Sequence, residues 1–193
     1  MAIELLSDKI RSFGGTSIDT LNPNDKNANI ILSNGNLTAT AISTSQKAVR
    51  ALKGHSTGKR QFEAILNVTA SNNMEIGIGT LLATLNNYVG SDAYAYAIEC
   101  YDGNKTHIGT QGFSGTSLTA GDIVGVCVDF NSRFISFFKN GWILGGTPAF
   151  TTIVAGTYYV MIGLYFTNNQ CTVNFGATNF SYPIYGFLPW NTP

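Results

Sequence analysis

Charged side chains are scarce in this 193-residue chain. Only 11% of the residues are Asp, Glu, Lys or Arg, and the 11 basic residues balance the 11 acidic ones to a formal net charge of zero. Binding to nucleic acid depends mainly on a basic surface that neutralises phosphates, so this balance argues against a nucleic-acid partner. It equally disfavours electrostatic attachment to anionic lipid.

Long hydrophobic runs are also missing. No stretch approaches the roughly 18 apolar residues that suggest a membrane helix. The opening stretch, MAIELLSDKIRSFGG, is interrupted by Glu4, Asp8 and Lys9, so it lacks the unbroken apolar core of a signal peptide. We therefore expect a soluble protein without membrane insertion or signal peptide, whose localisation the sequence leaves open.

Cysteine is rare, and its three occurrences are isolated. Cys100, Cys127 and Cys171 each sit inside an apolar run, and none belongs to a CxxC pair. Free Cys behaves as a small buried hydrophobe, whereas disulfide and metal sites show paired or clustered spacing. Three buried free thiols are therefore the favoured interpretation.

Residues for catalysis are few. The only histidines, His55 and His107, lie in segments with Gly and Lys neighbours, where a solvated or hydrogen-bonded histidine is more common than a catalytic base. Glu99 and Asp102 are the nearest approach to a carboxylate pair, and their spacing does not meet the pattern of lectin-like glycosidases. The sequence contains no metal-ligand cluster or nucleotide motif. We expect no enzyme activity, no cofactor and no metal site.

The hydrophobic periodicity that is present has a period of two. In QFEAILNV, the apolar residues Phe62, Ala64 and Leu66 fall on one face. Gln61 and Glu63 fall on the other. Such alternation is typical of a half-buried β-strand, so Gln61 and Glu63 are predicted to face solvent.

Similar runs recur along the chain. In IVGVCVDF, residues 123–130, both faces are largely apolar, which indicates a central strand. Other predicted strands are Asn36–Ile42, Ala48–Leu52, Glu75–Gly79, Tyr94–Cys100, Arg133–Lys139, Tyr158–Tyr165 and Gln170–Phe175. Clusters of turn-forming Gly, Asn, Ser and Pro separate them. Many short strands without a useful helical period predict an all-β sandwich or barrel.

One hairpin can be predicted closely. Asn140 and Gly141 follow the strand that ends at Lys139, and this pair tolerates the positive φ angles of a type I′ turn. Trp142 to Leu144 then return along the strand. Packing against the sandwich is the favoured role for Trp142, and stacking on a sugar is the alternative.

This hairpin lies within a run that resembles the most recognisable stretch of SPRY domains, GDIVGVCVDFNSRFISFFKNGWILGGTPAF. The matches are Gly121, Asp122, Gly125, Asp129, Ile135, Phe137, Asn140, Gly141, Leu144, Gly145, Ala149 and Phe150. The resemblance covers about residues 20 to 190. It implies a two-sheet antiparallel β-sandwich, similar in architecture to concanavalin A, that binds proteins, peptides or occasionally glycans through edge loops and has no catalytic machinery.

The resemblance also divides the chain. Residues 16–193 are predicted to form the sandwich, and residues 1–15 an N-terminal arm for attachment or oligomerisation. Residues 4–12 fit either a brief helix or a terminal strand.

In SPRY domains, three loops converge on one surface: the loop after the second strand, here Ile42–Lys47, the long loop that holds Tyr88, and the loop Thr167–Gln170. By position, this nominates as ligand-binding Ser43, Thr44, Tyr88, Asn168 and Asn169, with Trp142 as a further candidate.

Two classes of function remain open. The first is a non-catalytic module that binds a protein or peptide, with a virion structural or attachment protein as one setting. The alternative is a carbohydrate-binding, lectin-like protein, such as a receptor-binding or capsid or tail decoration protein of a bacteriophage, because the compact, Asn- and Thr-rich sequence is similar to SPRY domains on bacteriophage particles. A homo-oligomer or a larger assembly is expected in that setting.

Overall fold

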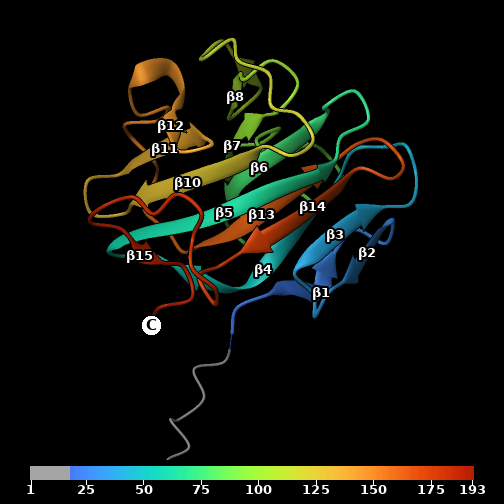
Figure 1. Ribbon diagram of the computed structural model, residues 1–193, viewed down its shortest axis with the longest axis horizontal. Helices are drawn as coiled ribbons and strands as arrows, with labels where there is room; N and C mark the ends of the chain where they lie inside the picture. The colour runs from blue at the N-terminus through green and yellow to red at the C-terminus, as the bar shows by residue number, and fades with distance from the viewer. Residues whose placement is uncertain (1–17) are drawn as a thin grey trace, which may run out of the picture.

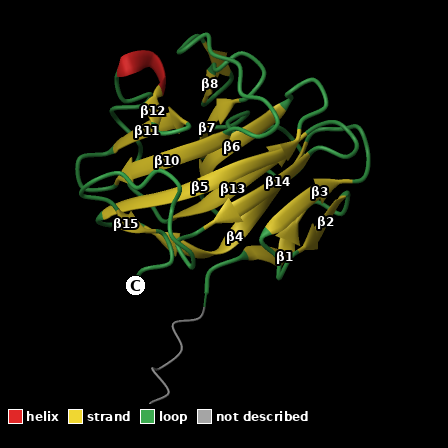
Figure 2. Cartoon of the chain, in the orientation of Figure 1, coloured by secondary structure: helices red, strands yellow, loops and turns green. Residues whose placement is uncertain are grey.

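The computed structural model describes residues 18–193, and the predicted arm of residues 1–15, with its helix or strand at residues 4–12, lies outside them. The described chain is a sandwich of two β-sheets (Figure 1), and all its strand pairs except one are antiparallel. Its one helical element is the 3-10 turn η1 (Leu144–Gly146), drawn red in Figure 2. No helix within residues 18–193 is long and apolar enough to cross a membrane. The predicted all-β, two-sheet antiparallel sandwich is confirmed.

The two sheets interleave in sequence. Sheet A contains, in spatial order, β1 (Leu21–Lys26), β4 (Lys47–His55), β13 (Tyr158–Leu164), β6 (Met74–Gly79), β7 (Ala95–Glu99), β8 (Lys105–Thr106) and β9 (Thr110–Gln111). Sheet B contains β12 (Trp142–Ile143), β11 (Phe134–Lys139), β10 (Ile123–Asp129), β5 (Lys59–Val68), β14 (Gln170–Asn174), β3 (Thr38–Ala41) and β2 (Ile30–Ser33), and β15 (Leu188–Pro189) pairs with β5.

The core lies between the sheets and is filled by alternate residues of each strand. Phe62, Ala64 and Leu66 of β5 are fully buried there, as the period of two predicted. Phe137 of β11, two strands from β5 in sheet B, joins the same core. Burying a side chain of this size stabilises the fold by about 1.5–3 kcal/mol, so the inward faces account for much of the stability.

Strand β10 is central, as predicted. It pairs with β5 on one side and β11 on the other, and its valines at 124, 126 and 128 point into the core. Cys127, on the opposite face, is buried too. Apolar residues on both faces of β10 therefore fit a central strand whose two faces are covered by protein.

The prediction for the outer face of β5 is wrong. Gln61 and Glu63 are buried rather than solvated, because the segment of residues 176–190, here called the C-terminal strap, crosses this face. The Glu63 carboxylate accepts the backbone amides of Ser181 at 2.9 Å and Tyr182 at 2.7 Å. Gln61 donates to the Tyr182 carbonyl at 2.8 Å and accepts the Ile184 amide at 2.8 Å. Gln61 and Glu63 therefore bind the backbone of the C-terminal strap instead of water.

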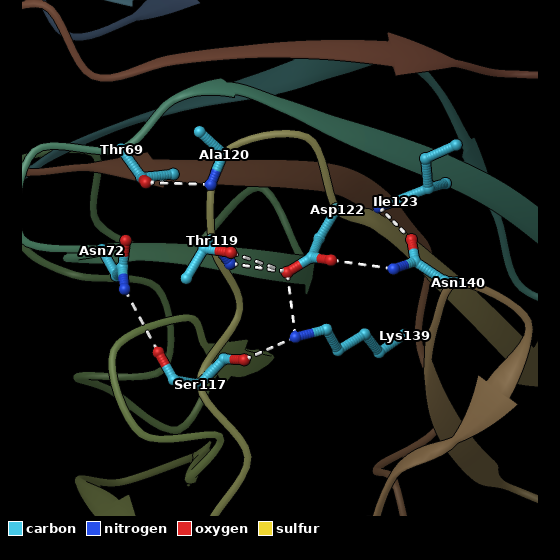
Figure 3. A network of polar contacts seen from close by, with 9 residues as sticks. All are labelled: Thr69, Asn72, Ser117, Thr119, Ala120, Asp122, Ile123, Lys139 and Asn140. Carbon is cyan, nitrogen blue, oxygen red and sulfur yellow. Dashed lines mark hydrogen bonds and ion pairs between the residues drawn. The ribbon is translucent and has the colours of Figure 1, made fainter.

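The predicted hairpin turn is present between β11 and β12. Asn140 and Gly141 have φ angles of 49° and 84°, as a type I′ turn requires. The turn is anchored to the start of β10 by Asp122, which accepts from the Asn140 side chain at 2.8 Å and from the Thr119 amide at 2.8 Å (Figure 3). Lys139 pairs with the same carboxylate at 3.0 Å.

Candidate functional site

Two of the three nominated loops meet at one end of the sandwich. The loop between β3 and β4 and the loop between β13 and β14 touch through the hydroxyls of Thr44 and Thr167, 3.2 Å apart. The amide of Ser45 donates to the carbonyl of Tyr165 at 3.0 Å. We call the surface formed by residues 42–47, 84–89 and 165–169 the loop surface.

Lys47 lies beneath the loop surface and holds two of its loops together. Its side chain is fully buried, and its ammonium donates to the carbonyls of Ser43 at 2.7 Å, Tyr165 at 2.9 Å and Ser45. Desolvation lowers the pKa of Lys47, and the three carbonyls take up all three of its N–H donors. One buried cation thus links both loops and fixes their conformation before any ligand binds.

Nothing in the sequence indicates this role of Lys47 beyond its place at the end of a loop. Lysine is almost never fully buried unless it is paired, so a lysine at the start of an apolar strand is ordinarily assigned to solvent. The acceptors that compensate its burial are backbone carbonyls, which residue types do not reveal.

The loop that holds Tyr88, residues 80–94, lies on the outer face of sheet A. Ala83 and Val89 from this loop form a small apolar cluster with Ala48, Ala97 and Met161, whose strand neighbours point inward. The carbonyl of Leu85 accepts the amide of Ala48 at 2.9 Å, directly beside Lys47. Tyr88 is half-buried, and its loop reaches the same end of the sandwich as the other two.

A buried carboxyl lies beneath this loop. Glu75 points to the outer face of sheet A and is held by a hydrogen bond from the Val89 backbone, while its Oε2 has no hydrogen-bond partner among residues 18–193. Desolvation, reinforced by Glu99 directly across the strand pair, raises the pKa of Glu75 to about 8. The Tyr88 loop therefore covers a buried carboxyl whose pKa lies well above its ordinary value.

Ser43, Thr44 and Asn168 lie together on the loop surface. Thr44 and Asn168 are exposed, and Ser43 is half-buried with its hydroxyl 3.4 Å from that of Ser45. Asn168 has a φ of 71°, a left-handed conformation that Asn tolerates better than most residues. These side chains are available to a ligand.

Asn169 is not available, which corrects its nomination as a ligand-binding residue. It is fully buried, its side-chain oxygen accepts the Ala70 amide at 2.6 Å, and its side-chain nitrogen donates to the Asn73 carbonyl at 3.0 Å. Both groups belong to the backbone of the partly buried turn between β5 and β6. Asn169 therefore pins the turn between β5 and β6 against the loop surface.

Trp142 also differs from its prediction, because it does not pack on the sandwich. It is 82% exposed on the two-residue edge strand β12. Strands β12 and β3 are five strand-to-strand steps apart in sheet B, or about 24 Å, and they lie on opposite sides of Figure 1. Trp142 consequently belongs to a different surface from Thr44.

The three cysteines are free and buried, as predicted. Burial raises the pKa of the Cys171 thiol to about 12 and that of Cys127 further, so neither forms a thiolate readily. Within residues 18–193, no group of three or more His, Cys, Asp or Glu side chains is placed to hold a metal ion.

Comparison with known proteins identifies the family. Residues 59–178 match the SPRY domain. The chain belongs to the SPRY domain family. It is 34% identical over 142 residues to the E3 ubiquitin-protein ligase RKP of Arabidopsis thaliana, a match that covers 68% of this chain and 10% of that protein. It is 31% identical over 116 residues to Ran-binding protein 9 of Xenopus laevis, covering 60% of this chain and 21% of the relative.

This SPRY chain thus spans a tenth to about a fifth of the length of these two relatives. Among solved structures it is similar to the SPRY domain of human HERC1, with a TM-score of 0.72 and 21% identity. That match covers 82% of this chain and 99% of the HERC1 domain. It supports the same fold for nearly all of the described sandwich.

Proposed function

We propose that this SPRY chain is a non-catalytic protein-interaction module that holds a peptide segment of a partner protein on its loop surface. The observation that carries the proposal is Lys47, whose ammonium links Ser43, Ser45 and Tyr165 from two loops. Loops that are ordered before binding lose less conformational entropy when a partner docks. Binding residues are often found on loops held by a rigid scaffold.

The chemistry of the loop surface suits a peptide. Thr44 and Asn168 present exposed hydroxyl and amide groups that can bond to a peptide backbone. Tyr88 adds an aromatic ring on the neighbouring loop, and tyrosine is enriched among the residues that contribute most to protein binding. Two proteins similar to this chain are named as an E3 ubiquitin-protein ligase, RKP, and as Ran-binding protein 9.

A random peptide library displayed on phage and selected against the whole chain tests the proposal. We expect selected peptides whose binding falls at least about tenfold in Thr44→Arg, because a bulky cation then occupies the loop surface, and by about 2 kcal/mol in Tyr88→Ala. Trp142→Ala is the matched control, since its side chain lies on another surface, and it should bind these peptides normally. The proposal fails when every selected peptide tolerates both Thr44→Arg and Tyr88→Ala.

A carbohydrate ligand is the second candidate, and Trp142 favours it. The indole is 82% exposed, and the neighbouring Gly141 lies close to the ring of Tyr182, since a Cβ built at Gly141 would be 2.7 Å from that ring. Exposed aromatic rings can stack on the apolar faces of sugars. Glycan-array binding that is lost in Trp142→Ala and kept in Thr44→Arg would support this candidate. The virion setting and self-association stay predictions, and size-exclusion chromatography tests the latter.

A further inference from the structure

An apolar groove lies at the other end of sheet A from the loop surface. It has a volume of about 630 Å³ and is formed by the two ends of the Tyr88 loop together with residues 154–159. Leu81, Leu82 and Val154 line it and are 62%, 70% and 62% exposed. Neighbouring apolar side chains of this size that stay exposed on a soluble domain mark an interaction site.

A polar pocket of about 300 Å³ adjoins the groove and shares Val154 with it. Lys105 lines this pocket, donates to the Ala149 carbonyl at 2.8 Å and lies 5.2 Å from the centre of the Phe150 ring. Residues 18–193 offer no acceptor for the other two N–H groups of its ammonium. The cation is therefore held in place by the protein while retaining donors for a ligand.

His107 is fixed beside this lysine. Its ring stacks on Tyr96, with centroids 4.0 Å apart and planes 10° apart, and its Nδ1 lies 3.0 Å from the Ala95 carbonyl. A carbonyl can only accept, so Nδ1 carries the proton and Nε2 is left for a ligand. No carboxylate of residues 18–193 lines either the groove or the pocket.

We propose that the groove and the pocket together form a second peptide site, which takes an acidic side chain at Lys105, a peptide N–H at the Nε2 of His107 and apolar side chains in the groove beside Leu81 and Leu82. Charge complementarity selects the acidic side chain, because the pocket offers the Lys105 ammonium as a donor and no acidic group. The adjoining apolar groove favours a peptide with hydrophobic residues over a small inorganic anion. A nucleic acid would need many more cations than this one lysine provides.

This site is separate from the loop surface of the proposed function. Strand β13 runs from Tyr158, which lines the groove, to Leu164, which precedes the loop surface. Its seven residues place the two ends about 20 Å apart. The chain could thus hold two peptide segments at once, and either site can be lost without the other.

The phage-displayed random library, selected against the whole chain, also tests this site. We expect a family of peptides with Asp or Glu next to Leu, Ile or Phe, whose binding falls at least about tenfold in Leu82→Asp and Lys105→Met. Thr44→Arg, on the loop surface, should leave these peptides unaffected. Leu82 is largely exposed, so Leu82→Asp should melt at nearly the same temperature as the wild-type chain.

Charge reversal provides the sharper arm of the test. In Lys105→Glu, the selected acidic peptides should lose binding, and the same peptides with Lys in place of the acidic residue should regain it. The proposal is overturned by selected peptides that lack acidic residues, by binding that Leu82→Asp and Lys105→Met leave intact, or by a selection that enriches only peptides sensitive to Thr44→Arg. The last result would leave the proposed function standing.

Discussion

The side-chain amide of Asn140 donates to the carboxylate of Asp122 at 2.8 Å. Its side-chain oxygen accepts the Ile123 amide, also at 2.8 Å. The two residues are 18 positions apart and belong to the Gly-Asp and Asn-Gly pairs of the family's most recognisable stretch. Figure 3 shows this contact, which joins the start of β10 to the end of β11. We call the contact between Asp122 and Asn140 the clasp. The spacing of the motif therefore reflects one physical contact between the start of β10 and the turn after β11.

Asp122→Ala should destabilise the chain by about 2 kcal/mol or more, because it leaves several donors of this clasp without their charged acceptor. Asp122→Asn keeps an acceptor for Thr119 and removes the ion pair with Lys139, so its loss should be smaller. Urea unfolding of both variants measures the difference. Equal stability of Asp122→Ala and the wild-type chain would show that the clasp is dispensable.

Asn169→Ala should also lower stability by about 2 kcal/mol, since the Ala70 amide and the Asn73 carbonyl would lose the partner that the fully buried Asn169 side chain supplies. The neighbouring Asn168→Gly is the matched control. Its exposed side chain makes no hydrogen bond within residues 18–193, and glycine adopts the φ of 71° without strain. Thermal melts of the two variants should therefore differ clearly, and a stable Asn169→Ala would contradict the pinning role.

Glu75 should make the chain less stable as pH rises. Its ordinary pKa of 4.5 is raised to about 8 in the folded state, so between these values the folded chain holds a proton that the unfolded chain has released. This contribution is fully present below about pH 4.5 and is lost as pH rises through about 8. Asp19, with its pKa raised to about 6 by burial, acts in the same direction over the lower part of this range.

The Glu75→Gln variant isolates that effect. Denaturant melts between pH 5 and pH 8 (about the range in which the carboxyl titrates) should show a smaller fall in stability for Glu75→Gln than for the wild-type chain. Comparing variants matters, because burial lowers the pKa of His55 and gives a slope of opposite sign. Parallel profiles of stability against pH for the two proteins would show that Glu75 does not cause the fall in stability.

Glu63→Ala should loosen the C-terminal strap, because the carboxylate holds the amides of Ser181 and Tyr182. Cys127 lies on the same outer face, paired in register with Gln61 of β5. Its thiol should therefore react faster in Glu63→Ala, while Cys100 and Cys171, which point into the core, stay slow. Mass spectrometry after pulsed thiol labelling distinguishes the three. Uniformly slow labelling would mean that the strap does not depend on Glu63.

The sequence by itself determined the sandwich, its central strand and its hairpin turn. A period of two places Phe62, Ala64 and Leu66 on one face whatever else surrounds the strand, and the positive φ angles of Asn140 and Gly141 follow from local sterics. Such features depend on neighbouring residues along the chain. They can therefore be predicted without knowing the tertiary structure.

Only the tertiary structure decided which polar groups face solvent. Gln61 and Asn169 are buried because segments distant in sequence bring matching backbone groups to them. Lys47 is buried because the carbonyls of its own loop and of the distant Tyr165 accept from its ammonium, whereas Trp142 stays exposed because no segment of residues 18–193 covers the edge strand β12. Residue type alone assigns amides and ammonium groups to water and indoles to the core. The free energy of a polar group depends instead on the partners that the fold supplies.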